Sequence, residues 1–149
     1  MRSYSMLALS YTADPDPSLL ERPIFCSPVP AGFPSPAQDF IESILDVNAF
    51  LVAHPAATYY VRVSGDSMEG AGILNGDYLV VDRAVEATNG AIVIAIVDQE
   101  LTVKRFYKRG GRIELRPENK AYQSIWVKGE MELIIWGVVT GVFRKTVTL

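Results

Sequence analysis

Hydrophobic and polar residues alternate along most of the chain after residue 58, which is the pattern of half-buried β-strands. Tyr59, Val61 and Val63 occupy one face of the first such segment. Turn sequences then separate further apolar segments, which predict strands at residues 78–81, 91–97, 101–107, 112–116, 124–127 and 133–143. Hairpin-length turns at this spacing indicate a mostly antiparallel, strongly bent β-domain.

The first quarter of the chain differs, because it holds seven of the nine prolines. Proline fixes its own φ and disfavours a helical preceding residue, so residues 1–34 are predicted to form an extended N-terminal arm. One short helix is predicted to begin at Ser35, with Pro36 at its first position and Gln38 closing a capping box, and to run to about Asn48. A total of 149 residues fits one β-domain, at residues 35–149, behind this arm.

Charge changes this picture little but limits the partners. The chain has 14 basic and 17 acidic residues, a net charge of −3, which is the wrong sign for a protein whose main task is to grip phosphates. We therefore expect protein partners and no direct sequence-specific DNA binding. The apolar segments are too short for a signal peptide or a membrane span, so a cytoplasmic protein without membrane contact is expected.

The chain has a single cysteine, Cys26, and a single histidine, His54. These exclude an internal disulfide and a Cys/His zinc site, so neither a metal nor another cofactor is predicted. A Ser-His-Asp triad would have to use His54. The loop around Ser67 departs from a nucleophile elbow, because Glu69 replaces the second glycine and the histidine precedes the serine. We interpret His54 as a turn residue beside Pro55.

A serine can also be activated by lysine, if burial lowers the lysine pKa from about 10.4 toward 7 or 8. Lys104 lies in a predicted strand beside the apolar Val103 and Phe106. Ser67 follows a strand in a glycine-flanked loop, where backbone N–H groups could face an oxyanion. Taken singly, a loop serine is usually a turn residue and a strand lysine a surface charge, so the residues alone leave both roles open.

A wider pattern is more specific. Residues 63–68 (VSGDSM), 76–82 (GDYLVVD) and 102–105 (TVKR) occur in this order, followed by 117–119 (PEN), Tyr122 and 136–139 (WGVV). Together they resemble the LexA/UmuD family of self-cleaving serine peptidases over roughly residues 30–143. The resemblance implies Ser67 as nucleophile, Lys104 as general base, and backbone N–H groups at Ser67 and Met68 as the oxyanion site.

The arm holds a segment that looks like the family's cleavage site, residues 30–37 (PAGFPSPA). The substrate is expected to be the chain's own Ala31-Gly32 bond, whose small residues let the strand approach Ser67 closely. Only 31 proline-rich residues precede Gly32, too few for the helix-turn-helix domain of a repressor, so the mutagenesis branch of the family fits better. Cleavage would leave 118 residues without cysteine.

The resemblance also implies partners. A RecA nucleoprotein filament would stimulate cleavage in the SOS response, and the trimmed homodimer would act as accessory subunit of a UmuC-type, error-prone translesion DNA polymerase. Two other classes of protein stay open. One is a proteolytically inactive interaction module, and the other is a trans-acting serine protease similar to signal peptidases.

Overall fold

The computed structural model describes residues 11–12, 21–25, 31–32 and 41–148, without the side chains of residues 11, 12, 25, 41 and 42. Among these residues there are three short helices: α1 (Val47–Leu51), and the single-turn η2 (Pro55–Ala57) and η3 (Glu69–Ala71). The strands are β1 (Tyr11–Thr12), β2 (Glu21–Phe25), β3 (Ile41–Asp46), β4 (Thr58–Arg62), β5 (Tyr78–Asp82), β6 (Ile92–Val97), β7 (Glu100–Arg109), β8 (Arg112–Arg116), β9 (Ile125–Val127) and β10 (Leu133–Phe143).

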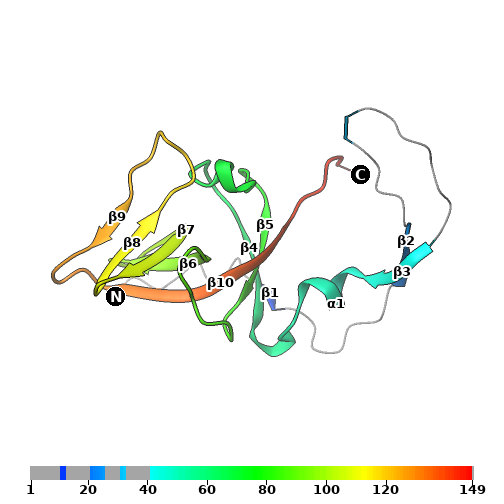
Figure 1. The fold of residues 1–149 in the computed structure, drawn as a ribbon, viewed down its shortest axis with the longest axis horizontal. Coiled ribbons are helices and arrows are strands. Elements are labelled where there is room, and N and C mark those ends of the chain that lie inside the picture. Colours follow the sequence, from blue (N-terminus) through cyan, green and yellow to red (C-terminus); the bar gives the residue numbers. More distant parts are fainter. Residues whose placement is uncertain (1–10, 13–20, 26–30, 33–40, 149) are drawn as a thin grey trace.

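Eight of these strands form one sheet in the order β1-β4-β5-β10-β6-β7-β8-β9, with every neighbouring pair antiparallel. The long strand β10 runs through the middle of the body (Figure 1). Its first half pairs with β6 and its second half with β5, so that Val138 lies opposite both Val93 and Asp82. A Cβ at Gly137 would lie 2.6 Å from Cγ1 of Val81, so only glycine allows this close crossing.

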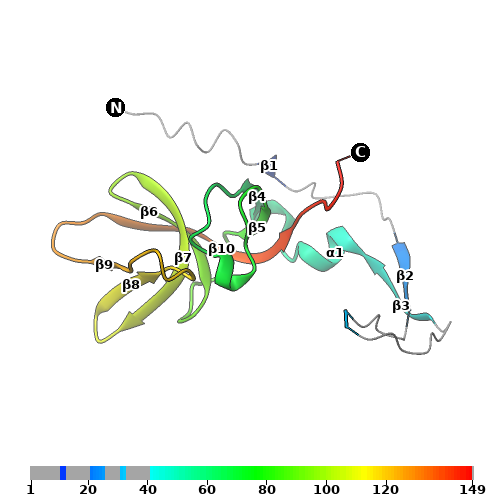
Figure 2. The same cartoon turned by 90° about the horizontal axis from the view of Figure 1, so that it is seen from above.

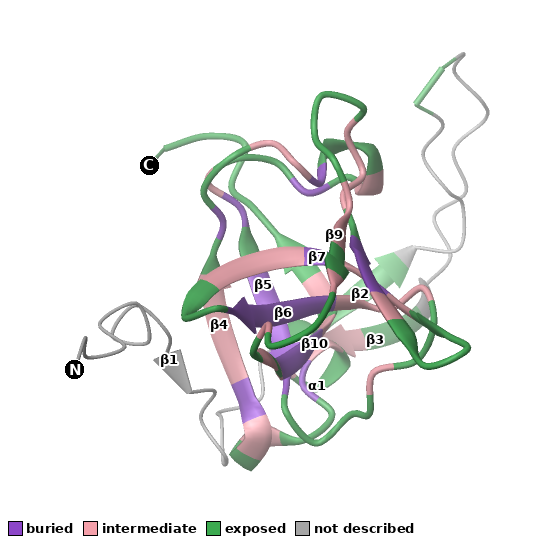
Figure 3. Cartoon of the chain, turned by 90° about the vertical axis from the view of Figure 1, so that its left-hand side faces the viewer, coloured by how far each residue is buried: buried purple, intermediate pink, exposed green. Residues whose placement is uncertain are grey.

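Two hydrophobic cores lie on the two faces of the central strands, and the buried positions gather on β5, β6 and β10 (Figure 3). Strand β6 serves both cores by alternation, with Ile94 and Ile96 in the first and Val93, Ala95 and Val97 in the second. The first core also contains Met68, which follows Ser67 and is 2% exposed. The loop that carries Ser67 is thereby anchored in the interior.

The predicted helix from Ser35 to Asn48 is wrong over residues 41–46. Residues 35–40 lie outside the described part of the chain, and residues 41–46 form β3, which pairs with β2 in a second, two-stranded sheet. The helix α1 begins at residue 47, because the Asp46 carboxylate accepts a hydrogen bond of 2.7 Å from the N–H of Ala49 and caps it. One short α-helix is therefore confirmed among the described residues, but at residues 47–51.

The predicted fold class is confirmed: the domain is mostly antiparallel β with one short α-helix. All seven strands predicted after residue 58 are present as β4 to β10. The β2–β3 pair, which the sequence did not predict, lies at the opposite end of the molecule from β8 and β9 in both views (Figures 1 and 2). The division of the chain at residue 34 stays a prediction.

Candidate active site

Ser67 and Lys104 meet in space although 37 residues separate them. Ser67 lies in the loop after β4, and Lys104 in the first half of β7. The Nζ of Lys104 is 3.0 Å from the Oγ of Ser67, within hydrogen-bonding distance. The fold therefore brings together the two side chains that the sequence singled out.

The surroundings of Lys104 favour a neutral amine. The residue is 7% exposed, and burial lowers the pKa of Lys104 below its ordinary value of 10.5. The amine donates to Oγ1 of Thr102 at 2.8 Å and to the carbonyl of Val103 at 2.9 Å. A neutral amine has two N–H groups and one lone pair, so these two acceptors leave the lone pair for the hydroxyl proton of Ser67. The contact with Thr102 was not predicted from the sequence.

The loop that holds Ser67 also presents backbone donors. Gly65 has a φ of +97°, which a residue with a side chain rarely adopts, and its N–H donates to Oδ1 of Asn75 at 2.9 Å. Among the described residues, neither the N–H of Ser67 nor that of Met68 donates to a protein acceptor. These two amides are therefore available to an incoming oxyanion.

A second loop, between β8 and β9, fixes the serine loop from outside. The N–H of Glu118 donates to the carbonyl of Ser67 at 2.8 Å, and the N–H of Gly70 donates back to the carbonyl of Glu118 at 2.7 Å. A Cβ at Gly70 would lie 2.6 Å from that carbonyl oxygen, so this approach requires glycine. The Glu118 carboxylate in turn binds Arg105, the neighbour of Lys104.

Two further side chains of the same loop hold Asp66, the residue before the serine. Nδ2 of Asn119 donates to the backbone carbonyl of Asp66 at 3.0 Å. The hydroxyl of Tyr122 donates to the Asp66 carboxylate, and this bond raises the pKa of Tyr122. The motif residues 117–122 thus position the serine loop.

The dyad lies on the wall of a cleft of about 290 Å³, lined by residues 61–68, Ile94, residues 101–104 and Tyr122. Both strands that border it have free backbone edges there. Within the described residues, β8 pairs with β7 only from Arg105 onward, and β1 pairs with β4 only at Tyr59 and Tyr60. Such edges can bond an extended peptide as an added strand.

Comparison with known proteins shows the family to which the chain belongs. A model of the peptidase S24-like family matches residues 23–140. The chain belongs to this family. It is 44% identical to Protein SamA of Salmonella typhimurium over 140 residues, which cover 94% of this chain and 97% of SamA. Protein MucA of Escherichia coli is 45% identical over 119 residues, which cover 79% of this chain and 81% of MucA.

A LexA repressor from Anaeromyxobacter is also similar, at 43% identity over 129 residues; these cover 85% of this chain but 55% of the repressor. The predicted family and enzyme class are confirmed: the S24 peptidase is a LexA/UmuD-type autocatalytic serine peptidase. The predicted function class is confirmed at the same level, since the chain is a homologue of the UmuD-type SOS-mutagenesis proteins.

Two predicted residues of the S24 peptidase lie apart from the dyad. Ala31 and Gly32 are both exposed, and neither lines the cleft. A Cβ built on Gly32 would meet no atom within 4 Å. In the structure, Ser67, Met68 and Lys104 thus lie together in the cleft lining, whereas the predicted scissile bond lies outside the cleft. Cys26 lies outside the described residues.

His54 is not part of this site. It precedes η2, which confirms its turn position, and its Nδ1 lies 2.6 Å from Oδ2 of Asp82 at the end of β5. Thr58 pairs with Asp82 across β4 and β5, whereas the strand end nearer Ser67 pairs Arg62 with Tyr78. The histidine thus lies at the other end of the strand pair.

Neither a metal-binding group nor a membrane-spanning helix occurs in the described part of the chain. In that part of the chain, no group of three His, Cys, Asp or Glu side chains is placed to hold a metal ion. No described helix has the length and apolar character needed to cross a membrane.

Proposed function

We propose that this S24 peptidase cuts its own Ala31-Gly32 bond, with Ser67 as nucleophile and Lys104 as general base. The observation that carries the proposal is the 3.0 Å contact between Nζ of Lys104 and Oγ of Ser67, made by a lysine that is 7% exposed. Its other hydrogen-bond partners in the structure are a hydroxyl and a carbonyl, and none is a carboxylate that would stabilise its charge.

The chemistry follows from these contacts. Neutral Lys104 takes the hydroxyl proton as Oγ of Ser67 bonds to the carbonyl carbon of Ala31, and the N–H groups of Ser67 and Met68 hold the oxyanion. The C–N bond to Gly32 then breaks, and the Lys104 ammonium gives its proton to the leaving amine. Lys104 next removes a proton from water, which attacks the acyl carbon; the ester bond to Oγ of Ser67 then breaks, and the Lys104 ammonium returns the proton to Oγ. The products are a free Ser67 hydroxyl, a carboxylate at Ala31 and a chain that begins at Gly32.

Cleavage requires the arm to move. Ala31 and Gly32 are exposed and outside the cleft, so the bond must enter before Ser67 can attack it. An extended segment can pair with the free edges of β4 and β7, and small residues at the bond allow a close approach to Oγ. A conformational step would therefore control the rate.

The biological role we propose is SOS mutagenesis. A RecA nucleoprotein filament would favour the state with the arm in the cleft. The trimmed chain, as a cytoplasmic homodimer, would serve a UmuC-type translesion polymerase. Similarity to SamA and MucA over most of the chain supports this role.

The test is a mass measurement. Purified protein at about pH 10, where even a weakly perturbed lysine is largely deprotonated, is expected to accumulate the 118-residue fragment from Gly32 to Leu149. Ser67→Ala abolishes the fragment, whereas Ser43→Ala, at an exposed serine of β3 that does not line the cleft, retains it. An unchanged mass both alone and with activated RecA filament would favour the inactive interaction module. Many turnovers on an unrelated peptide would favour a trans-acting protease.

A further inference from the structure

The charge of the chain is divided very unevenly. Residues 101–129 hold eight of the 14 basic residues and only two of the 17 acidic ones, Glu114 and Glu118. The rest of the chain is strongly acidic. An overall charge of −3 therefore conceals a basic region built on β7, β8 and β9.

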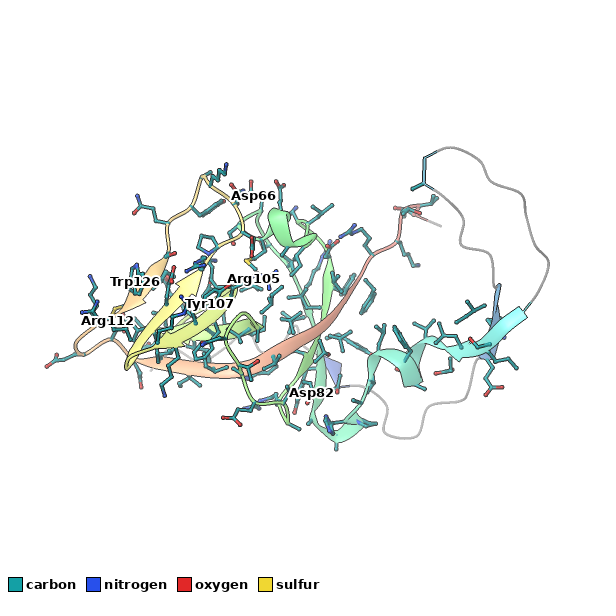
Figure 4. All side chains as sticks on the ribbon, viewed as in Figure 1. Asp66, Asp82, Arg105, Tyr107, Arg112 and Trp126 are labelled. Atoms are coloured by element: carbon teal, nitrogen blue, oxygen red, sulfur yellow. The ribbon has the colours of Figure 1, made fainter. Side chains whose placement is uncertain are left out.

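Strand register gathers much of this region on one face. Tyr107 lies opposite Glu114, Arg109 opposite Arg112, and Glu114 opposite Trp126. Directly opposed residues project from the same side of a sheet, and alternate residues of a strand share a side. We define the arginine face as Tyr107, Arg109, Arg112, Glu114, Arg116 and Trp126. Figure 4 shows Tyr107, Arg112 and Trp126 along the yellow and orange strands at one end of the molecule.

The two tryptophans of the chain differ sharply in exposure. Trp136 is 7% exposed and belongs to the first core, whereas Trp126 is 46% exposed. Trp126 lines a shallow hollow with Arg112, Val127 and Lys128. An exposed indole ring beside cationic side chains offers a flat apolar surface that is not part of either hydrophobic core.

Two of the three guanidinium groups of this face lie against Tyr107. The Cζ of Arg116 lies 4.3 Å from the centre of the Tyr107 ring, and that of Arg109 lies 5.6 Å from it. Glu114 binds Arg116 at 2.8 and 2.9 Å. Within the described part of the chain, no carboxylate lies within ion-pair distance of Arg109, Arg112 or Lys128. Three cations thus remain beside two rings for an external anion.

We propose that the arginine face binds single-stranded nucleic acid without regard to base sequence. A base would stack on Trp126, and phosphates would bind Arg109, Arg112 and Lys128. This combination of an exposed ring with neighbouring cations on a sheet surface suits a partner that carries both flat bases and regular negative charges. An acidic protein segment would use the cations but not the indole face. The acidic remainder of the chain would repel a nucleic-acid strand and so direct it to the arginine face.

This inference does not depend on self-cleavage. On β7, the residues of the arginine face project from the side of the sheet opposite to Lys104. None of the residues of the arginine face lines the catalytic cleft. Binding and cleavage can therefore be measured separately, and either can fail alone.

The test uses the full chain with Ser67→Ala, so that it stays uncut, and an oligothymidylate of about 20 nucleotides at about 50 mM salt. Binding is followed by anisotropy of a labelled oligonucleotide and by tryptophan fluorescence, which a base stacked on Trp126 would quench. Raising the salt to about 200 mM is expected to weaken binding about 20-fold if three phosphates are neutralised.

Variants locate the site. Arg112→Glu and Trp126→Ala are each expected to weaken binding about tenfold or more. Lys145→Glu makes the same charge change as Arg112→Glu on an exposed residue after β10, and is expected to stay within about twofold of the parent.

Three results would overturn the proposal. The first is no binding of the oligonucleotide at low salt. The second is an equal loss in Arg112→Glu and Lys145→Glu, which would indicate a diffuse charge effect. The third is equal competition by polyglutamate without any change in tryptophan fluorescence, which would assign the arginine face to an acidic protein partner instead.

Discussion

The two ends of the β4–β5 strand pair carry side-chain couples that are alike in distance but not in surroundings. At one end His54 lies 2.6 Å from Asp82, and at the other Lys104 lies 3.0 Å from Ser67. The histidine side chain is 52% exposed, and the hydroxyl of its neighbour Thr58 donates to the carbonyl of His54. Lys104 is 7% exposed and faces a serine beside a cleft.

This contrast teaches that a hydrogen-bonded base does not define an active site. A His–Asp couple becomes catalytic only where a nucleophile reaches the free nitrogen of the ring. Here Asp82 also accepts a hydrogen bond of 2.8 Å from the N–H of Ala84, so the couple closes a turn. On our proposal, the His54 end contributes to stability and the Ser67 end to chemistry.

The largest expected effect is a difference in self-cleavage rate between substitutions of Lys104 and of His54. Lys104→Ala should reduce self-cleavage by at least about 1,000-fold, because the proton of Ser67 then has no acceptor. His54→Ala should leave the rate within about twofold of wild type, since no proton transfer passes through it. Intact-mass time courses at alkaline pH measure both. A comparable loss in the two variants would make His54 part of the catalytic machinery and break the comparison.

For the free energy of unfolding, we expect the larger loss at the His54–Asp82 end. Asp82→Ala removes a carboxylate that is 1% exposed, and leaves the Ala84 N–H and the His54 ring without their acceptor. We expect the free energy of unfolding to fall by about 3 kcal/mol. Urea denaturation measures it, with the exposed Glu86→Ala as a control that should change it by less than about 0.5 kcal/mol. A small change in Asp82→Ala would mean that the turn holds without the couple.

The buried lysine should lower stability at neutral pH. Burial lowers the pKa of Lys104 below 10.5, so between the two pKa values the unfolded chain binds a proton that the folded chain lacks. Stability should therefore rise with pH through this window. In a Ser67→Ala background, Lys104→Met should remove this slope and raise the free energy of unfolding at pH 7 by about 1 kcal/mol. Urea denaturation at several pH values tests both, and an unchanged slope would contradict the assignment.

The smallest expected effect concerns Thr102, which we regard as a positioning residue. Thr102→Val removes the acceptor that orients Nζ of Lys104, and should slow self-cleavage about three- to tenfold. Thr102→Ser keeps a hydroxyl and should restore the rate to within about twofold. Rate measurements on the three proteins at one alkaline pH suffice. Equal rates in the valine and serine variants would show that the hydroxyl has no role.

The sequence predicted the sheet well because its strands are alternating or continuously apolar segments separated by short turn sequences. It failed over residues 41–46, where Ile41, Ile44 and Leu45 have helical spacing but pair with β2, an earlier segment of the chain. Ile44 is 64% exposed, so the helical spacing of these apolar residues does not correspond to a buried helix face. Pairing between segments distant in sequence overrode the local pattern.

The active site shows the same limit. Residue types and the family pattern singled out Ser67 and Lys104, but not the contact with Thr102 or the bonds from Glu118 to the serine loop. The contact between His54 and Asp82 was also not predicted, because it joins residues 28 apart in the sequence that come together through the register of β4 and β5. The arginine face was hidden in a net charge that averages two opposite regions.

The position of β10 has a consequence for timing. Ser67 belongs to the β4–β5 side of the sheet and Lys104 to the β6–β7 side, and the two sides are joined through β10, the last strand along the chain. During synthesis the arm therefore leaves the ribosome long before this joining strand is complete. If the arm is cut as proposed, the two sides of the site would be held together only after residues 133–143 have emerged and paired. The order in which the strands are made would then protect a growing chain from premature trimming.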